Sequence, residues 1–241
     1  IHGFLFSTDE MREIFSDKSW AQKWLDTEAA LAKAQGELGV IPKEKADIIN
    51  KYADANLLDL ASIGEFYKSS ITIVPLLKAF KKVLPDNAGE FVHWGATSQD
   101  IVDTGLVLLE RDAYQVILRD MKECLKHCLT LAKKYRNTAQ AGRTHVVHAI
   151  PITFGYKAAV WADELGRDIE RLEAMKDRVF VGEMAGAVGT LASQPEKGLE
   201  TQKRMMEILG LNVPTIAWHV ARDNQAEFVS TLAICAGTIG R

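Results

Sequence analysis

The sequence predicts an all-α protein, with a small N-terminal helical domain over residues 1–95 and part of a long-helix bundle over residues 96–241. Two observations predict this class. The first is a pair of amphipathic runs, over residues 100–135 and 151–181, that are far longer than the ~11-residue average helix. The second is that no credible run of alternating polar and apolar residues marks a β-strand. Several long helices in succession are typical of a helical bundle.

Each helix is expected where apolar residues recur at helical spacing between a capping residue and a breaker. The expected helices cover residues 20–38, 42–53, 58–84, 100–136, 153–181, 196–209 and 221–241. An earlier helix starts after Ser7 or Thr8, either of which can cap it. Pro75 kinks or breaks the run in which it lies. A glycine-rich stretch over residues 182–189 predicts a loop.

The composition excludes several classes of protein. The chain has 241 residues, a formal charge of -3 and 47% hydrophobic residues, which is typical of a soluble globular protein. Its basic and acidic residues are interspersed, so we expect neither nucleic acid nor a membrane surface as a partner. No apolar run approaches the ~18 residues of a membrane span. Three cysteines form no disulfide framework, and no signal peptide is recognisable, so a cytoplasmic location is expected.

The two ends of the chain suggest a piece of a longer protein. The run over residues 221–241 reaches the last residue without a proline or a polar cluster to stop it, so we expect truncation at the C-terminus within a bundle helix. The chain begins with Ile1 rather than methionine, so the natural start is also expected to be missing. A genuinely short protein with a frayed end is the alternative.

Three polar segments are candidates for chemistry, and the first is HWGATSQD at residues 93–100. Gly95 allows the backbone to approach a ligand closely. Thr97, Ser98 and Gln99 then present hydroxyls, an amide and unpaired N–H groups where a long helix starts. Such a turn favours a bound carboxylate, because the unpaired donors and the helix dipole both attract an anion. The alternative is a plain helix cap formed by Thr97 or Ser98.

The second segment, over residues 142–155, joins the two longest runs. It gathers a cation, a hydroxyl and two imidazoles, from Arg143, Thr144, His145 and His148. Histidine is the side chain best suited to proton exchange near neutral pH, so the segment is a candidate for acid–base catalysis. One alternative is a pair of structural histidines. Another is a metal site, but no nearby carboxylate completes one.

The third segment is WHVARDN at residues 218–224. Arg222 carries a planar guanidinium that can hold a carboxylate through two parallel hydrogen bonds. The alternative is an ordinary helix start with Asp223 in the first turn. Either interpretation places this polar segment at the beginning of the last expected helix.

Together these segments resemble the fumarase/aspartase superfamily in order and spacing. HWGATSQDIVDT, from residue 93, resembles its first conserved region. GRTH at residues 142–145, followed by His148 and PITFG at residues 151–155, resembles the second. GAVGT at residues 186–190 resembles the glycine loop that comes next. The resemblance covers essentially the whole chain.

Within the superfamily the chain looks most like 3-carboxy-cis,cis-muconate cycloisomerase. The features that carry this preference are residues 7–17, Gln99, and the WH pair before RD at residues 218–223. Adenylosuccinate lyase is the alternative, because residues 37–42 and 148–155 look like that family. Against it stand residues 69–76, which read SSITIVPL, whereas the lyase usually has a histidine in a TRHD stretch there.

The resemblance implies proton transfer next to a carboxylate of a small anionic polycarboxylate, coupled to making or breaking a C–O or C–N bond. Donors aimed at the growing negative charge would stabilise it. His145 is the expected catalytic residue, transferring a proton to or from the heteroatom. The residues expected to bind the substrate are His93, Thr97, Ser98, Gln99, Arg143, Thr144, His148 and Arg222. No metal and no organic cofactor is required.

The resemblance also implies a homotetramer whose active sites are shared between subunits. In such enzymes a serine on a mobile loop, with a signature like SSxMPxKxNP, is assigned as the base. That signature is absent from this sequence and is expected beyond Arg241. We therefore expect the chain to be inactive by itself. A helical scaffold that kept the fold and lost activity is the alternative from another functional class.

Overall fold

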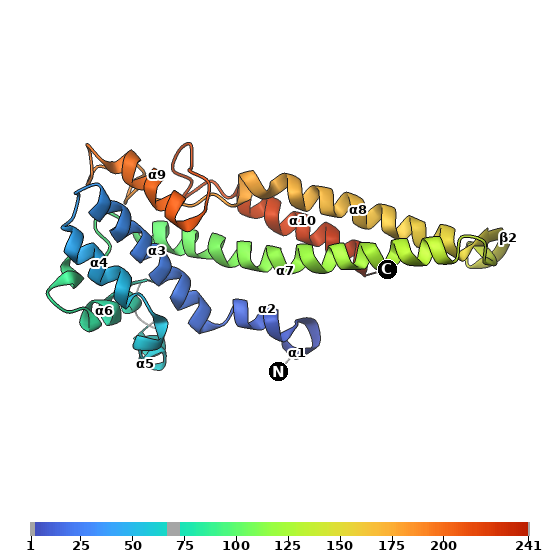
Figure 1. Cartoon of the computed structure of the whole chain (residues 1–241), viewed down its shortest axis with the longest axis horizontal. Coiled ribbons are helices and arrows are strands. Elements are labelled where there is room, and N and C mark those ends of the chain that lie inside the picture. The colour runs from blue at the N-terminus through green and yellow to red at the C-terminus, as the bar shows by residue number, and fades with distance from the viewer. Residues whose placement is uncertain (1–2, 67–72, 241) are drawn as a thin grey trace. The chain divides into compact units, whose positions relative to one another are not determined.

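Helices make up nearly all of the regular structure of residues 3–66 and 73–240, which the computed structural model describes (Figure 1). The all-α prediction is confirmed in this part of the chain. The chain divides into two units: Ile1–Ala113 with Phe180–Arg222, and Tyr114–Val179 with Asp223–Arg241. The predicted domain limit between residues 95 and 96 stays a prediction. No described helix combines the length and the apolar character that crossing a membrane requires.

The first unit contains short helices around one long one. Its elements are α1 (Gly3–Phe6), α2 (Asp9–Ile14), α3 (Asp17–Glu37), α4 (Lys43–Tyr52), η1 (Ala55–Leu57), α5 (Leu60–Phe66), α6 (Val74–Val83), η3 (Ala88–Phe91), the start of α7 (Ser98–Lys134) and α9 (Gly198–Leu209). Thr8 caps α2 as predicted, because its Oγ1 accepts the N–H of Met11 at 3.2 Å. Pro75 lies in the first turn of α6, where a missing N–H breaks no helical bond. Residues 67–72 lie outside the described residues.

The core of the first unit gathers side chains mainly from α3, α4, α6 and the start of α7. Helix α3 also packs against α9. The fully buried side chains of the core include Leu25, Ile49, Leu76, Phe80 and Ile101. The start of α7 approaches α3 closely at Gly105, where an added Cβ would lie 2.5 Å from Cδ1 of Trp24. A side chain at this position would force the two helices apart, so glycine permits the approach.

In the second unit, α8 (Phe154–Val179) and α10 (Asp223–Ile239) pack against each other. The rest of α7 runs alongside α8, joined to it by the ion pair between Lys122 and Glu173 at 2.7 Å (Figure 1). The buried apolar side chains of α8 form one stripe: Ala158, Ala162, Leu165, Ile169, Leu172, Met175 and Val179. This spacing of three and four residues is the pattern from which the helix was predicted. The long helices expected over residues 100–136 and 153–181 are confirmed.

The expectation that no strands occur is wrong for the segment between α7 and α8. Here β1 (Ala139–Thr144) and β2 (Val147–Thr153) form an antiparallel hairpin. Its two-residue turn has positive φ at His145 (46°) and Val146 (67°), as a tight hairpin turn requires. Asn-Gly is the usual signal for such a turn, and a His-Val turn gives no signal of this kind. The hairpin was therefore not recognisable from local sequence.

Candidate functional site

The first polar segment begins with a clamped turn in the first unit. His93 has a φ of 66°, a conformation that non-glycine residues rarely adopt. Glu28 of α3 holds both parts of this residue. Its Oε2 accepts the backbone N–H of His93 at 3.0 Å, and its Oε1 lies 2.6 Å from the ring Nδ1. The Glu28 side chain is fully buried. One carboxylate therefore fixes the backbone and the imidazole of His93 together.

The next two residues are held through their backbone carbonyls. Gln35 of α3 donates from Nε2 to the carbonyl of Trp94 at 2.7 Å, and Gln194 donates to the same oxygen at 3.3 Å. Ser193 donates from Oγ to the carbonyl of Gly95 at 3.1 Å. An added Cβ at Gly95, where φ is 74°, would lie 2.6 Å from Gln194 Nε2. The positive φ therefore favours glycine, and a Cβ would also displace the Gln194 amide that binds the Trp94 carbonyl.

The start of α7 follows this turn. Ser98 is its first residue, so the N–H groups of Ser98 and Gln99 have no carbonyl to bind within the helix. Among the described residues, no other group accepts a hydrogen bond from either N–H. Thr97 differs, because its N–H donates to Oδ2 of Asp100 at 2.8 Å. The arrangement leaves two backbone donors and the nearby hydroxyls available to an anion.

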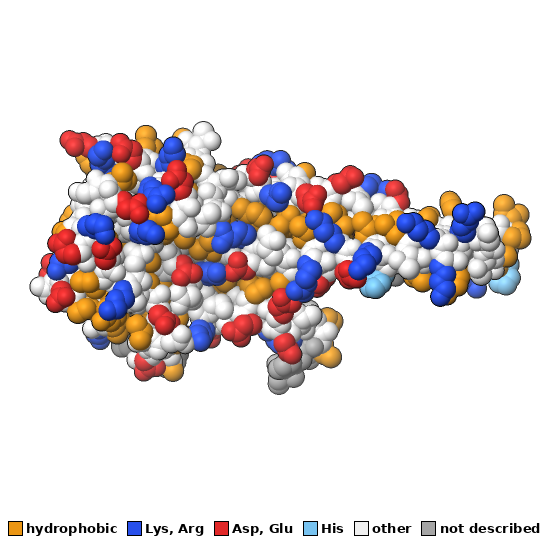
Figure 2. All heavy atoms as spheres, in the orientation of Figure 1, with side chains coloured by type: hydrophobic (Ala, Val, Ile, Leu, Met, Phe, Trp, Pro, Cys, Tyr) orange, Lys and Arg blue, Asp and Glu red, His pale blue; other side chains and the backbone are white. Residues whose placement is uncertain are grey.

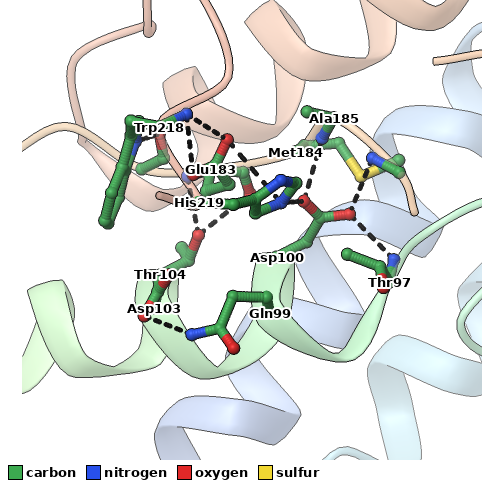
Figure 3. Close-up of polar contacts among 12 residues, drawn as sticks. Thr97, Gln99, Asp100, Asp103, Thr104, Glu183, Met184, Ala185, Trp218 and His219 are labelled. Atoms are coloured by element: carbon green, nitrogen blue, oxygen red, sulfur yellow. Dashed lines mark hydrogen bonds and ion pairs between the residues drawn. The ribbon is translucent and has the colours of Figure 1, made fainter. Parts of the chain in front are cut away.

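Asp100 is the centre of the contacts in Figure 3. Its Oδ2 also accepts the N–H of Gly186 at 3.0 Å, and its Oδ1 accepts the N–H of Ala185 at 3.0 Å. The ring of His219 completes the set, with Nε2 at 2.8 Å from Oδ1. Asp100 is fully buried. This one carboxylate therefore ties the α7 start to the glycine loop and to the third polar segment.

Glu183 approaches the same ring nitrogen of His219 as Asp100 does. Its fully buried carboxylate accepts the backbone N–H of Trp218 at 3.0 Å and lies 3.8 Å from Nε2 of His219. Thr104 fixes the backbone of Glu183, since its hydroxyl accepts the Glu183 N–H at 2.8 Å and donates to the Glu183 carbonyl at 2.9 Å. Burial raises the pKa of Glu183 to about 7, although the Trp218 N–H opposes the change. The residue therefore exchanges a proton near neutral pH.

Asp100, Glu183 and His219 are also the residues whose spacing would suit a metal ion. In the described part of the chain, each offers one ligand atom, and these atoms lie within 4.8 Å of one another. Their hydrogen bonds account for the grouping, because both Asp100 oxygens already accept two donors each. A metal would have to displace those donors. The expectation that no metal or cofactor is required stays a prediction.

Arg222 joins the third segment to the first. Its Nη1 lies 2.9 Å from Oδ2 of Asp103. The other oxygen of Asp103, Oδ1, accepts the Gln99 amide at 2.7 Å (Figure 3). Nη2 of Arg222 donates to the carbonyl of His219 at 2.7 Å, and its guanidinium lies 5.7 Å from the ring of Trp218. Arg222 thus holds a carboxylate of the protein. The expectation that Arg222 binds a substrate carboxylate stays a prediction.

The second polar segment lies in the second unit, on the hairpin. Arg143 and His148 are directly opposite in the strand register, so their side chains share one face. Thr144 closes the turn and His145 occupies it. All four residues are exposed. The turn geometry presents His145 at the end of the hairpin, where a proton-transfer group would be accessible to a ligand.

The predicted site residues thus form two groups. His93, Thr97, Ser98, Gln99 and Arg222 belong to the first unit, and Arg143, Thr144, His145 and His148 to the second. Sequence reasoning missed the groups that hold the first set: Glu28, Asp103, Glu183 and His219. A signal existed for Glu28, which interrupts a small and apolar face of its helix. The partners of Asp100 lie in or beside segments that the sequence patterns single out, but no local pattern pairs them with Asp100, because they are 85 to 119 residues away.

Comparison with known proteins identifies the family. A family described as "Lyase" matches residues 4–241. The chain is 48% identical over 239 residues to N-acetyl-S-(2-succino)cysteine lyase of Enterococcus italicus, covering 98% of this chain and 52% of that protein. It is 43% identical over 240 residues to adenylosuccinate lyase of Methanocaldococcus jannaschii, covering 99% of this chain and 52% of that protein. The chain therefore spans about half the length of these relatives.

Solved structures agree. The crystal structure of fumarate lyase from Mesorhizobium sp. BNC1 superposes with a TM-score of 0.93 at 42% identity, covering 98% of this chain and 56% of that one. The 3-carboxy-cis,cis-muconate lactonizing enzyme of Pseudomonas putida gives a TM-score of 0.96 at 36% identity, covering 100% and 56%. Fold, sequence and the three polar segments lead to one conclusion, namely that this chain belongs to the lyase family of the fumarase/aspartase superfamily.

Proposed function

We propose that the protein containing this chain is a lyase. Its substrate carries a succino group bonded to sulfur or nitrogen, and the reaction breaks that bond. In this reaction a base removes the proton from the carbon next to a carboxylate. The electron pair forms a carbon–carbon double bond, and the C–S or C–N bond breaks. The heteroatom leaves with its electrons and receives a proton, and fumarate is the other product.

The observation that carries the proposal is the start of α7. The N–H groups of Ser98 and Gln99 have no acceptor among the described residues, and the hydroxyls of Thr97 and Ser98 stand beside them. These donors suit the carboxylate on which negative charge grows when the adjacent proton leaves. Asp100 secures them, because its buried carboxylate ties this turn to the glycine loop. Preorganised donors lower the barrier without reorganising during the reaction.

The remaining roles follow from charge and position. His145 is the proposed acid that protonates the leaving heteroatom. Thr144 adds a hydroxyl near that group. His93, Arg143 and His148 are proposed to bind the other anionic groups of the substrate, and Arg222 keeps the α7 start in register through Asp103.

The relatives favour elimination over cycloisomerisation as the reaction. The two enzymes at 48% and 43% identity are named for substrates that contain a succino or succinate group. 3-Carboxy-cis,cis-muconate cycloisomerase of Acinetobacter baylyi is 37% identical. This order favours elimination over the cycloisomerase preferred from sequence segments. Cycloisomerisation remains the second candidate, since the P. putida lactonizing enzyme has the higher TM-score of the two crystal structures.

We also propose that the active site is shared between subunits of a homotetramer. Apolar side chains lie exposed on the helices of the second unit, as Figure 2 shows along one face. They include Tyr156, Val160, Val229, Ile234 and Ile239. Exposed apolar surface of this kind marks a protein–protein interface. A subunit interface would also cover the hairpin, whose His145 is exposed in the single chain. The predicted cytoplasmic location stays a prediction.

The test is an assay of the full-length protein against three substrates: N-acetyl-S-(2-succino)cysteine, adenylosuccinate and 3-carboxy-cis,cis-muconate. Fumarate formation reports the first two reactions, and NMR detection of a lactone reports the third. We expect fumarate, with the highest kcat/KM for N-acetyl-S-(2-succino)cysteine. The His145→Ala protein, purified in parallel, controls for contaminating lyases.

The outcomes separate the alternatives. Lactone without fumarate would establish the cycloisomerase and reject elimination. No turnover of any of the three substrates by a folded tetramer would favour the scaffold without activity.

A further inference from the structure

Glu28 is the buried carboxylate nearest to a predicted substrate-binding residue. It lies on α3, on a helix face where its neighbours Trp24, Leu25 and Leu31 are apolar and buried. The side chain of Glu28 is 0% exposed, and that of His93 is 18% exposed. A buried carboxylate is retained only where donors satisfy it. Here both donors belong to one residue, since Glu28 binds the N–H and the ring Nδ1 of His93.

This contact determines where the ring of His93 carries its proton. The backbone N–H is always a donor, so one carboxylate oxygen of Glu28 is committed to it. A carboxylate only accepts hydrogen bonds, so the other oxygen requires a proton on Nδ1. The remaining nitrogen, Nε2, has no partner among the residues that the structure describes. Nε2 is therefore the ring atom that remains for a ligand.

We propose that Glu28 is a positioning residue that keeps Nδ1 of His93 protonated and so offers Nε2 to a substrate carboxylate. With Nδ1 held by Glu28, the ring can donate to a substrate carboxylate only from Nε2. Its Nε2–H then donates a charge-assisted hydrogen bond to the substrate. This proposal rests on the proposed function, because it requires that His93 binds the substrate.

The geometry predicts what an isosteric change does. In Glu28→Gln, the single amide oxygen stays with the backbone N–H of His93, because that group cannot accept. The amide NH2 then faces Nδ1 and requires it to be unprotonated. The imidazole becomes the neutral tautomer with its proton on Nε2. Adding a second proton at Nδ1 would break the hydrogen bond from the introduced amide. Shape and packing are kept, while the ring with a proton on both nitrogens is lost.

The kinetic test uses the full-length enzyme and whichever substrate it turns over. We expect Glu28→Gln to raise KM about 10-fold or more, the scale of a lost charge-assisted hydrogen bond, with little change in kcat. His93→Gln should raise KM similarly. In the double variant KM should be no higher than in His93→Gln alone, because Glu28 acts through His93. Multiplied KM effects in the double variant would overturn the proposal.

Gln35→Met is the matched control. Gln35 lies on α3, as Glu28 does. The methionine has a similar size but cannot donate to the Trp94 carbonyl, and the Glu28–His93 contact stays intact. Equal increases in KM for Gln35→Met and Glu28→Gln would show that Glu28 only supports the turn. Circular dichroism and the melting temperature of each variant confirm that it is folded.

A second readout needs no activity. In the protein labelled with 15N-histidine, long-range 1H–15N spectra report which ring nitrogen carries a proton, and His93→Gln identifies the His93 signal. We expect a protonated Nδ1 in the wild type and an unprotonated Nδ1 in Glu28→Gln. An unprotonated Nδ1 in the wild type would reject the proposal. If no substrate is turned over, the proposed function fails, while this spectrum still decides the role of Glu28.

Discussion

His145 bears on the proposed chemistry, and Glu183 bears on how stability depends on pH. His145 occupies a hairpin turn with a φ of 46°, next to Val146 with a φ of 67°. Positive φ at a β-branched residue is costly, by about 1–3 kcal/mol, and persists where surrounding contacts enforce it. Glu183 is buried between the backbone of Trp218 and the ring of His219. A change at His145 should alter kcat, and a change at Glu183 should alter the pH dependence of stability.

His145→Ala in the full-length enzyme should lower kcat by about 10²-fold or more at saturating substrate, because a general acid of this kind contributes that factor. Steady-state kinetics measure it. His127→Ala is the control, since His127 is an exposed histidine of α7 that pairs with Glu123 on the same helix. Near-normal kcat after the His145 change would assign proton transfer to another residue.

Glu183→Gln should make stability depend less on pH. Burial raises the pKa of Glu183 from 4.5 to about 7, so the folded protein binds an extra proton between these values. Stability contributed by that proton is present at low pH and is lost as pH rises through about 7. Glutamine stays neutral throughout, so the free energy of unfolding of the variant should rise relative to that of the wild type as pH increases. Urea unfolding at pH 5 to 8 measures the difference, and parallel curves for the two proteins would contradict it.

At the scale of elements, the two glycines of α8 have different reasons to be there. Gly155 lies where α8 starts beside the end of α7, and an added Cβ would lie 2.6 Å from the Ala132 carbonyl oxygen and 2.6 Å from Arg136 Cα. Those contacts are to backbone, which cannot turn aside. Gly166 has no atom within 4 Å of the position that a Cβ would take. One glycine is required by packing, and the other only weakens the helix.

Alanine at these two positions should therefore act in opposite directions. Gly155→Ala should lower the free energy of unfolding by about 1–3 kcal/mol, the usual cost of overpacking. Gly166→Ala should raise it by as much as ~1 kcal/mol, because alanine is the better helix former. Chemical denaturation of both variants measures the two effects. Stabilisation by Gly155→Ala would show that α7 and α8 are further apart at this point than the structure has them.

At the scale of the whole molecule, the predicted site residues belong to two units of the chain, and the chain spans about half the length of its relatives. The donors of the α7 start lie in the first unit, and His145 lies in the second. No recognisable base for the carbon-bound proton occurs in the sequence. The complete reaction is therefore expected to need a proton-accepting group that residues 1–241 do not supply.

We predict that the 241-residue chain alone has no measurable lyase or cycloisomerase activity. Losing one proton-transfer partner costs about 10²–10⁴-fold. Its exposed apolar residues should also make it associate, as Tyr156 and Ile239 are 63% and 62% exposed. Light scattering and assays on adenylosuccinate and carboxymuconate measure both properties. Turnover at the rate of the full-length enzyme would show that the base is already present, and a stable monomer would contradict the predicted association.

Local patterns were enough to predict several elements and their ends. The helices α7 and α8 follow from stripes of apolar residues. Residue type alone predicts a cap at Ser7 or Thr8, and the structure has it at Thr8. The start of α7 was recognised as a candidate anion site because hydroxyls and glycine stand together before a long helix. These features depend on neighbours within a few turns, so sequence alone determines them.

Tertiary structure decided which polar groups meet. Asp100 binds Ala185, Gly186 and His219, which are 85 to 119 residues away, and Glu28 binds His93 across 65 residues. No periodicity reports such pairs, because their residues become neighbours only when helices pack. The hairpin at His145 was missed for a related reason: a His-Val turn lacks the glycine or asparagine that normally signals positive φ. The sequence determined the helices and the donors, whereas packing determined the carboxylates that hold them.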